Sequence, residues 1–170
     1  MAELILGGAR SGKSALAERH ARDSGLAVTY VATATAGDDE MAERIRHHRA
    51  RRPAHWVTVE APAELARILE HEAGAGRLLL VDCLTLWLGN LLDDAEALAA
   101  ERDALLTALP KLPGRTLLVS NEVGLGIVPD NALARRFRDE AGRLNQAVAA
   151  ACDRVTFVAA GLPLTLKGRD

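Results

Sequence analysis

Residues 7–14 read GGARSGKS, which matches the phosphate-binding pattern G-x-x-x-x-G-K-S/T. The pattern alone also occurs by chance, but here the apolar run ELIL at 3–6 precedes it and the helix-forming run ALAERHA at 15–21 follows it. A strand, a glycine-rich loop and a helix in this order are the context that such a loop requires. The segment therefore predicts a P-loop, and a glycine-rich turn without a ligand is the weaker interpretation.

The residue types of this loop suit a bound nucleoside triphosphate. Gly7 and Gly12 let the backbone turn so that its N–H groups, together with the start of the helix, point at phosphate oxygens. Lys13 is placed to reach the β- and γ-phosphates, and the Ser14 hydroxyl to ligate Mg²⁺. We expect nucleotide contacts from the whole loop: Gly7, Gly8, Ala9, Arg10, Ser11, Gly12, Lys13 and Ser14.

Short apolar runs alternate with helical patterns along the rest of the chain. Most runs are continuously apolar, which is typical of strands covered on both faces of a parallel sheet. The sequence predicts one domain over 1–170 with an α/β fold of the P-loop NTPase type (RecA-like), a mostly parallel sheet flanked by helices. The expected strands are 3–6, 27–33, 77–82, 115–121, 154–160 and, more weakly, 55–60; the expected helices are 12–24, 38–52, 62–74, 94–109 and 130–151.

Residues that are typical of helix ends and turns support these element boundaries. Asp38 is a suitable cap for the helix before Pro53, and Pro62 suits the first turn of the next helix. The segment LPKLPGR at 109–115 is expected to be a loop, and IVPDN at 127–131 to introduce the last helix.

The bulk composition limits the partners and the compartment. A net charge of −2 gives no global attraction to nucleic acid or anionic lipid, so a polyanion has to be bound locally. No stretch approaches the roughly 20 apolar residues of a membrane span, and the first residues lack the pattern of a signal peptide. Cys83 and Cys152 lie in apolar surroundings and predict buried free thiols in a reducing compartment. We expect a cytoplasmic protein.

A carboxylate ends one of the buried strands. The run LLLVD places Asp82 at the end of the predicted strand 77–82, where P-loop proteins usually hold the water shell of their magnesium ion. An Asp that caps the following helix is the alternative. The P-loop favours the metal-binding role, so Ser14 and Asp82 are the predicted Mg²⁺ ligands.

The segment RIRHHRARRP at 44–53 combines five arginines with two histidines. In a helix Arg44, His48 and Arg52 would lie along one face, with Arg51 beside them. Guanidinium groups bind phosphate and disfavour a charged imidazole, so a neutral histidine there could attack the α-phosphorus of a nucleotide. A solvated basic face is the competing interpretation. A nucleic-acid patch is disfavoured, because no aromatic residue is interleaved.

Longer blocks of sequence resemble a known family, the bifunctional adenosylcobinamide kinase / adenosylcobinamide-phosphate guanylyltransferases of cobalamin biosynthesis. The similarity covers nearly the whole chain, and its specific parts are the patterns RI-x-x-HR-x-x-RP-x-x-W and NEVG-x-GIVP. The blocks are GGARSGKS at 7–14, YVATA at 30–34, DDEMAERIRHHRARRPAHW at 38–56, VDCLTLW at 81–87 with NLL at 90–92, and NEVGLGIVPDNALARRFRDEAGRLNQ at 121–146.

The resemblance implies two activities. The first is phosphorylation of adenosylcobinamide with ATP or GTP, and the second is transfer of GMP from GTP to adenosylcobinamide phosphate through a guanylylated histidine. That histidine corresponds to His48, whereas His47 occupies a variable position. The resemblance also implies GTP contacts beyond the P-loop, from Ala32, Thr33, Ala34, Arg49, Ala50, Arg51, Arg52, Glu60 and Asp82. Asp82 stands where some relatives carry Glu.

Three questions stay open at the level of sequence. Asn121 and Glu122 follow a predicted strand at the edge where ligands bind in open α/β sheets, so they are candidates for substrate or magnesium contacts. Gly124 and Gly126 would allow that loop to move or to approach a ligand closely.

The chain could also be a P-loop kinase of another small molecule, or a nucleotide-dependent switch without catalysis. A chain this small has little surface to enclose a corrinoid, so we expect a homo-oligomer, such as a trimer.

Overall fold

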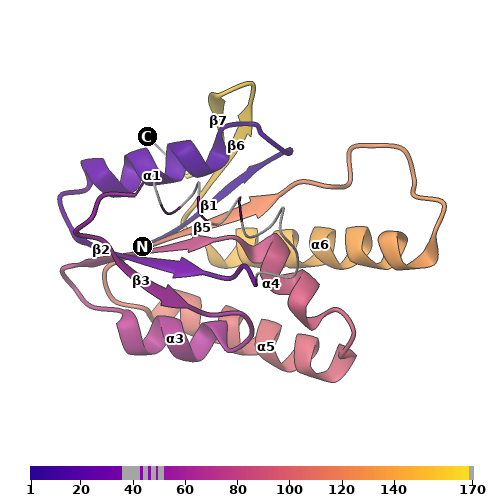
Figure 1. Cartoon of the computed structure of the whole chain (residues 1–170), viewed down its shortest axis with the longest axis horizontal. Coiled ribbons are helices and arrows are strands. Elements are labelled where there is room, and N and C mark those ends of the chain that lie inside the picture. The colour runs from indigo at the N-terminus through magenta and orange to yellow at the C-terminus, as the bar shows by residue number, and fades with distance from the viewer. Residues whose placement is uncertain (36–42, 44–45, 47–48, 50–51, 169–170) are drawn as a thin grey trace.

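A seven-stranded sheet in the order β3-β2-β4-β5-β1-β6-β7 forms the centre of the computed structural model (Figure 1). Strands β1 to β6 run parallel, and β7 pairs antiparallel with β6. The structure describes residues 1–35, 43, 46, 49 and 52–168. Its strands are β1 Ala2–Gly7, β2 Ala27–Ala32, β3 Val57–Glu60, β4 Arg77–Asp82, β5 Arg115–Asn121, β6 Arg154–Ala159 and β7 Leu162–Lys167.

Helices cover both faces of this sheet. In Figure 1, α1 lies on one face, and the other helices lie on the opposite face. Alternate residues of β1 enter different cores: Leu4 packs with the larger helical layer, and Ile5 packs with Leu16 of α1. The helices are α1 Lys13–Asp23, α3 Leu65–Glu72, α4 Leu84–Leu91, α5 Ala95–Ala108 and α6 Ala132–Ala151, with the 3₁₀ turn η1 Leu109–Lys111.

The predicted fold class is confirmed, and every predicted strand is present. The middle residues of the central strands are buried, as are Leu78 and Val81 of β4, because helices exclude water from both faces. Two helices begin at side-chain caps that the sequence analysis did not name. The Asp94 carboxylate accepts hydrogen bonds from two N–H groups at the start of α5, and the Asn131 side chain accepts one from Ala134 at the start of α6.

Two elements were absent from the sequence prediction. Helix α4 is apolar on most of its surface, with Leu84, Trp87 and Leu88 buried, so it lacks the alternation that marks an amphipathic helix. Strand β7 contains Pro163 and lies at the edge of the sheet, where a strand has a weak sequence signal. The Lys167 ammonium anchors it by donating to three carbonyls at the end of α6, those of Ala149, Ala150 and Cys152.

The prediction that Pro62 lies in the first turn of a helix was wrong. Helix α3 begins at Leu65, and the preceding carbonyls bond to side chains of α4. The Asn90 amide donates to the Pro62 carbonyl at 3.0 Å, and the Trp87 indole donates to that of Ala63 at 2.6 Å. These bonds hold the backbone out of the helix. The predicted loop 109–115 likewise begins with the 3₁₀ turn η1, and the predicted cap Asp38 lies outside the described residues.

Cys83 and Cys152 are buried free thiols, as predicted. Burial raises the pKa of Cys83 to about 11, and the nearby Asp82 carboxylate acts in the same direction. Burial raises the pKa of Cys152 to about 12. Both groups are therefore neutral thiols near pH 7. No described helix is long and apolar enough to cross a membrane.

Candidate functional site

The carboxyl ends of neighbouring strands collect most of the predicted site residues at one edge of the sheet. Glu60 of β3 pairs in register with Ala32 of β2, and Ala32 pairs with Asp82 of β4. Gly7, the first residue of the predicted P-loop, pairs with Asn121 of β5. Segments that are far apart in sequence therefore meet at the edge where open α/β sheets bind their ligands.

The P-loop connects β1 to α1, as its sequence predicts. Gly12 has a φ of 98°, a left-handed conformation that favours glycine, and it immediately precedes the first residue of α1. A Cβ atom at Gly7 would lie 2.6 Å from the Val158 carbonyl oxygen and would collide with the Ser11 hydroxyl. Both positions need glycine for a tight backbone path.

The turn between β6 and β7, near the other end of the sequence, contacts this loop. The Gly161 N–H donates a 2.8 Å hydrogen bond to the Ser11 carbonyl, and the Gly161 Cα lies 3.2 Å from where a Cβ of Gly12 would be. Gly161 joins β6 to β7, so the C-terminal hairpin fixes the conformation of the P-loop. On its other side the Gly7 carbonyl accepts a 3.0 Å bond from the Glu122 N–H.

Lys13 and Ser14 stand at the start of α1, where the N-terminal end of a helix attracts anions. The Lys13 side chain is 8% exposed, and its ammonium donates to the Gly8 carbonyl oxygen at 3.1 Å. This contact holds the cation within the loop, next to the N–H groups that a phosphate would meet. Ser14 is half-buried. The arrangement can bind a phosphate chain by charge and backbone hydrogen bonds together.

Asp82 ends β4, as predicted, and remains partly exposed. Its carboxylate and the Ser14 hydroxyl are oxygen donors, the type that Mg²⁺ prefers, and their role as metal ligands stays a prediction. No group of three His, Cys, Asp or Glu side chains suited to a metal occurs among the residues that the structure places. This donor set fits Mg²⁺, because Mg²⁺ in such sites is held by few protein ligands together with phosphate oxygens and water.

Thr33 fixes the loop that follows β2. It is fully buried, and its hydroxyl donates to the Cys83 carbonyl at 2.7 Å while accepting from the Cys83 N–H at 2.8 Å. The Asn90 amide donates to the Thr33 carbonyl at 2.9 Å. Thr33 is thus tied to β4 and α4 by its side chain, while Ala32 and Ala34 on either side are half-exposed. Its described role is structural, and nucleotide contact by these residues stays a prediction.

The cationic segment is described only in part. His48, Ala50 and Arg51 lie outside the described residues, as do His47 and Arg44. Among those described, Arg49 forms a 3.1 Å ion pair with Glu60, and both side chains are more than half exposed. The Arg52 guanidinium stacks on the Tyr30 ring, 3.3 Å from its centroid. Two arginines on the C-terminal side of this segment therefore contact β2 and β3, beside Asp82.

Tyr30 belongs to the block YVATA at 30–34, but the sequence analysis assigned no role to its side chain. Its hydroxyl donates a 3.0 Å hydrogen bond to Asp82, and its side chain is 2% exposed. Burial, followed by the charge of Asp82, raises the pKa of Tyr30 well above its ordinary value. The available signal was the single tyrosine of the chain, placed within a largely aliphatic strand.

Buried polar side chains support the end of β5. The Thr85 hydroxyl accepts from the Asn121 N–H at 2.7 Å, and the Asn145 amide donates to the Asn121 carbonyl at 3.2 Å. The Ser120 hydroxyl donates to Asn145 at 2.7 Å. Glu122 bonds within its own loop, accepting from the Gly124 N–H at 2.6 Å. These contacts hold the loop in place, and ligand contacts by Asn121 and Glu122 stay a prediction.

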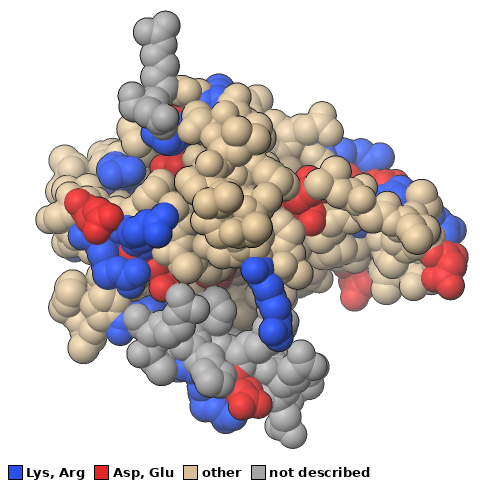
Figure 2. All heavy atoms as spheres, turned by 90° about the horizontal axis from the view of Figure 1, so that it is seen from above, with Lys and Arg blue, Asp and Glu red and all other residues tan. Residues whose placement is uncertain are grey.

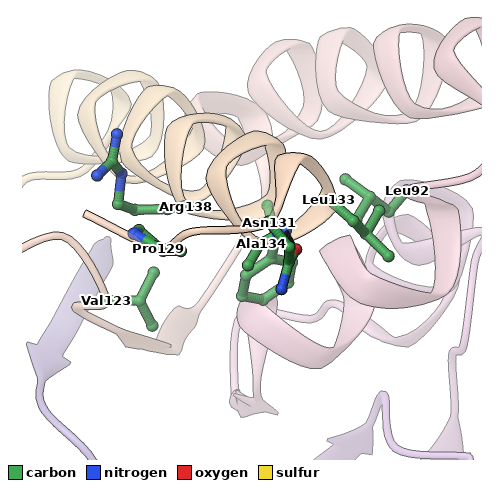
Figure 3. A pocket seen from close by; sticks show the side chains of 8 residues that line it. Leu92, Val123, Pro129, Asn131, Leu133, Ala134 and Arg138 are labelled. Carbon is green, nitrogen blue, oxygen red and sulfur yellow. Dashed lines mark hydrogen bonds between the residues drawn. The ribbon is translucent and has the colours of Figure 1, made fainter. Parts of the chain in front are cut away.

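An apolar hollow of about 450 Å³ lies beyond this loop, at the start of α6. Figure 3 shows Leu92 and Leu133 side by side at one end of the hollow and Val123 near Pro129 at the other. The loop between them carries side chains that are strongly exposed, with Leu125 at 81% and Ile127 at 97%. This surface is adjacent in the chain to the carboxyl edge of β5.

A glycine-rich loop between β1 and α1, with a carboxylate at the end of β4, defines a P-loop nucleotide-binding protein with a RecA-like sheet. Solved structures agree on the fold. A RadB recombinase aligns with a TM-score of 0.54 and 18% identity, covering 92% of this chain and 73% of that protein. A protein from Pyrococcus horikoshii OT3 aligns with a TM-score of 0.59 and 10% identity, covering 99% and 87%.

Sequence comparison is more specific. The family model CobU, cobinamide kinase / cobinamide phosphate guanyltransferase, matches residues 3–166, so the chain belongs to this family of bifunctional enzymes. The bifunctional adenosylcobalamin biosynthesis protein CobP of Pseudomonas aeruginosa is 66% identical over 170 residues, with 99% of this chain and 98% of the relative covered. CobU of Escherichia coli K12 is 42% identical over 179 residues, with 96% and 98% covered. The predicted family, and with it the assignment as a transferase of cobalamin biosynthesis, is confirmed.

Proposed function

We propose that the carboxyl edge of the sheet performs both transfers with GTP as the guanylyl donor and ATP or GTP as the phosphoryl donor. The observation that carries this proposal is the convergence of three elements at one edge: the P-loop after β1, Asp82 after β4, and the arginine segment that contacts β2 and β3. The first element binds phosphates, the second suits a metal ion, and the third offers further cations.

In the kinase step the P-loop and Lys13 hold the triphosphate. The hydroxyl oxygen of adenosylcobinamide attacks the γ-phosphorus, and the bond from that phosphorus to the β,γ-bridging oxygen breaks. The nucleoside diphosphate leaves, and the hydroxyl proton passes to solvent. Lys13 stabilises negative charge on the transferred group, which is the main contribution that a protein makes to phosphoryl transfer.

In the guanylyl step a neutral ring nitrogen of His48 attacks the α-phosphorus of GTP. A nitrogen–phosphorus bond forms, the bond to the α,β-bridging oxygen breaks, and pyrophosphate leaves. A phosphate oxygen of adenosylcobinamide phosphate then attacks the same phosphorus, which releases His48 and gives adenosylcobinamide-GDP. Support comes from Arg49 and Arg52, whose contacts bring both ends of the stretch 49–52 to the strands beside Asp82.

Ser14 and Asp82 would hold Mg²⁺ in this proposal. When bound, Mg²⁺ neutralises charge on the phosphates of the nucleotide. The chain supplies one hydroxyl and one carboxylate for it, from the beginning of α1 and the end of β4.

The proposal includes a homo-oligomer, such as a trimer, in the cytoplasm. Strand β7 exposes Leu162, Leu164 and Leu166 at 72%, 60% and 58%, and alternate residues of a strand share one face. Such a row on an edge strand suits burial against a second copy of the chain. Sedimentation equilibrium should show an oligomer that Leu164→Lys dissociates; a monomer at all concentrations would contradict it.

The two free thiols support a reducing compartment.

Cobinamide substrates and a nucleotide account for the expected partners without a nucleic acid. On the face in Figure 2, Lys and Arg lie beside Asp and Glu, and the middle of the face is largely uncharged. On this face, among the residues that the structure describes, opposite charges side by side provide no continuous basic surface for a phosphate backbone.

Incubation with α-labelled GTP and Mg²⁺ tests the guanylyl step directly. We expect label on the protein that is acid-labile and base-stable, and that adenosylcobinamide phosphate removes as adenosylcobinamide-GDP. His48→Ala should abolish labelling, whereas His47→Ala, the matched control, should leave it largely intact. Label on His48→Ala would refute the assignment of the nucleophile. Absence of label from the unaltered protein, with kinase activity retained, would favour the alternative of a P-loop kinase without nucleotidyl transfer.

A further inference from the structure

Three side chains from separate parts of the chain form a continuous contact beside the P-loop. Tyr30 of β2 lies in the middle: its hydroxyl donates to an Asp82 carboxylate oxygen at 3.0 Å. The Arg52 guanidinium carbon lies 3.3 Å from the centroid of the Tyr30 ring. One buried side chain thus contacts both a carboxylate and a cation assigned above to the nucleotide site.

The two contacts of Tyr30 use different parts of the same side chain. A phenol that bonds to a carboxylate must donate its proton, and burial among apolar neighbours keeps the hydroxyl protonated. The ring face attracts the guanidinium by its quadrupole, and this attraction is stronger where water is excluded. Substitution can therefore remove the hydroxyl without the ring, or remove both.

Arg52 depends strongly on the ring for its position. Its Nε is buried without a hydrogen-bond partner among the described residues. The hydrogen bond from its Nη1 to the exposed Thr58 hydroxyl is long, at 3.5 Å. With weak hydrogen bonding on the protein side, the stacking contact is the principal described constraint on the direction of this guanidinium.

We infer that Tyr30 is a positioning residue that aligns the magnesium carboxylate and the phosphate-binding arginine with each other. Its hydroxyl sets the orientation of Asp82 toward Mg²⁺, and its ring sets the orientation of Arg52 toward the triphosphate. The inference rests on the proposed function, in which Asp82 holds Mg²⁺ and Arg52 binds the nucleotide. It predicts that the two effects of Tyr30 separate cleanly by substitution.

Calorimetric binding of an α,β-methylene GTP analogue, which cannot guanylylate a histidine, tests the separation without catalysis. Tyr30→Phe should raise the Mg²⁺ concentration for half-maximal binding about 10-fold, because hydrogen-bond partners of metal ligands have effects of this size. Its Kd at saturating Mg²⁺ should stay near that of the unaltered protein. Tyr30→Leu should also weaken that Kd roughly 3- to 30-fold, the range of a lost cation–π contact.

Two further variants complete the design. Arg52→Ala should weaken the Kd at saturating Mg²⁺ as Tyr30→Leu does, with an unchanged Mg²⁺ requirement. Thr29→Val, the matched control, removes a buried hydroxyl from the same strand and should leave both quantities unchanged. A Tyr30→Phe protein with the Mg²⁺ requirement of the unaltered chain would overturn the inference.

Tyr30 is the single tyrosine of the chain, which permits a second measurement on the protein without any core substitution. Incorporated 3-fluorotyrosine gives one ¹⁹F resonance. Mg²⁺ added to protein already saturated with the analogue should shift that resonance, and Asp82→Asn should abolish this Mg²⁺-dependent shift. A resonance that does not move would overturn the inference even if Tyr30→Phe failed to fold.

The same experiments separate this inference from the proposed function. If Asp82→Asn leaves the Mg²⁺ requirement unchanged, the metal assignment itself is wrong and the inference falls with it. If Asp82→Asn raises the requirement and Tyr30→Phe does not, the metal assignment stands and the positioning role of Tyr30 alone is refuted.

Discussion

The Lys13 ammonium donates a hydrogen bond to the carbonyl oxygen of Gly8 at 3.1 Å, so the loop holds its own cation. A bound triphosphate would replace that carbonyl as the partner. We expect Lys13→Ala to lower kcat/KM of the kinase reaction on the order of 100-fold, because a charged donor in the transition state is lost. Steady-state kinetics with adenosylcobinamide would show it.

Arg19→Ala is the control for Lys13→Ala, because Arg19 is an exposed cation on the same helix. We expect it to keep the activity of the unaltered protein. Equal losses in the two variants would mean that net charge, and not the position of Lys13, governs the reaction.

Two glycines of the chain should respond oppositely to alanine. Gly7→Ala places a methyl group against the Ser11 hydroxyl and the Val158 carbonyl, so we expect a loss of about 1–3 kcal/mol in unfolding free energy and weaker nucleotide binding. Gly142→Ala, inside α6 with no atom within 4 Å of the new methyl group, should gain about 0.5–1 kcal/mol. Urea unfolding measures both, and a stable Gly7→Ala protein would contradict the tight path of the loop.

Glu3 should make stability depend on pH. Burial acts to raise its pKa, but hydrogen bonds with His20 and Thr156 and the charge of Arg154 outweigh burial, so the pKa lies below the ordinary 4.5. A lowered carboxylate pKa stabilises the fold above the ordinary value, and this contribution is lost as the pH falls through the folded pKa. We expect Glu3→Gln to lower the free energy of unfolding by about 2–3 kcal/mol at pH 7. This loss is smaller than that from breaking a fully buried ion pair.

The difference between Glu3→Gln and the unaltered protein should therefore shrink as the pH is lowered below 4.5. Urea titrations from pH 7 to pH 3 measure it. Glu70→Gln, at an exposed position, should show no comparable dependence. A difference that is constant over this range would show that the charge of Glu3 is not what stabilises the fold.

The two thiols should be inert in the folded protein. Cys83 and Cys152 are 6% and 2% exposed, with pKa values of about 11 and about 12, and the thiolate is the reactive form. At pH 8 we expect no rapid reaction with a disulfide reagent, and reaction of both thiols after unfolding in guanidinium. Fast labelling of either thiol without denaturant would contradict the buried placement.

Local patterns predicted the parts of the site that one segment forms alone. Residues 7–14 carry the whole signal of the P-loop, and Asp82 follows an apolar strand directly, so both were found without knowledge of the fold. The contacts of Tyr30 with Asp82 and Arg52 were not predictable. They depend on the order of the strands in the sheet and on the orientation of each side chain. Neither can be inferred from a local sequence pattern.

The missed elements have a similar explanation. Helix α4 is buried on most sides, so the polar face that would have revealed it is absent. Strand β7 needs β6 for its hydrogen bonds, and its own composition includes a proline. The late start of α3 follows from Asn90 and Trp87, which bond to carbonyls ahead of it from a helix that comes later in the chain.

The bond between Gly161 and Ser11 joins positions that are 150 apart in the chain. During translation the ribosome makes Ser11 early and Gly161 much later, and β6, a direct neighbour of β1, also emerges late. A nascent chain can carry the complete GGARSGKS motif and still lack the scaffold that shapes it. Competence to capture a nucleotide should thus arise only after β6 and Gly161 have been synthesised.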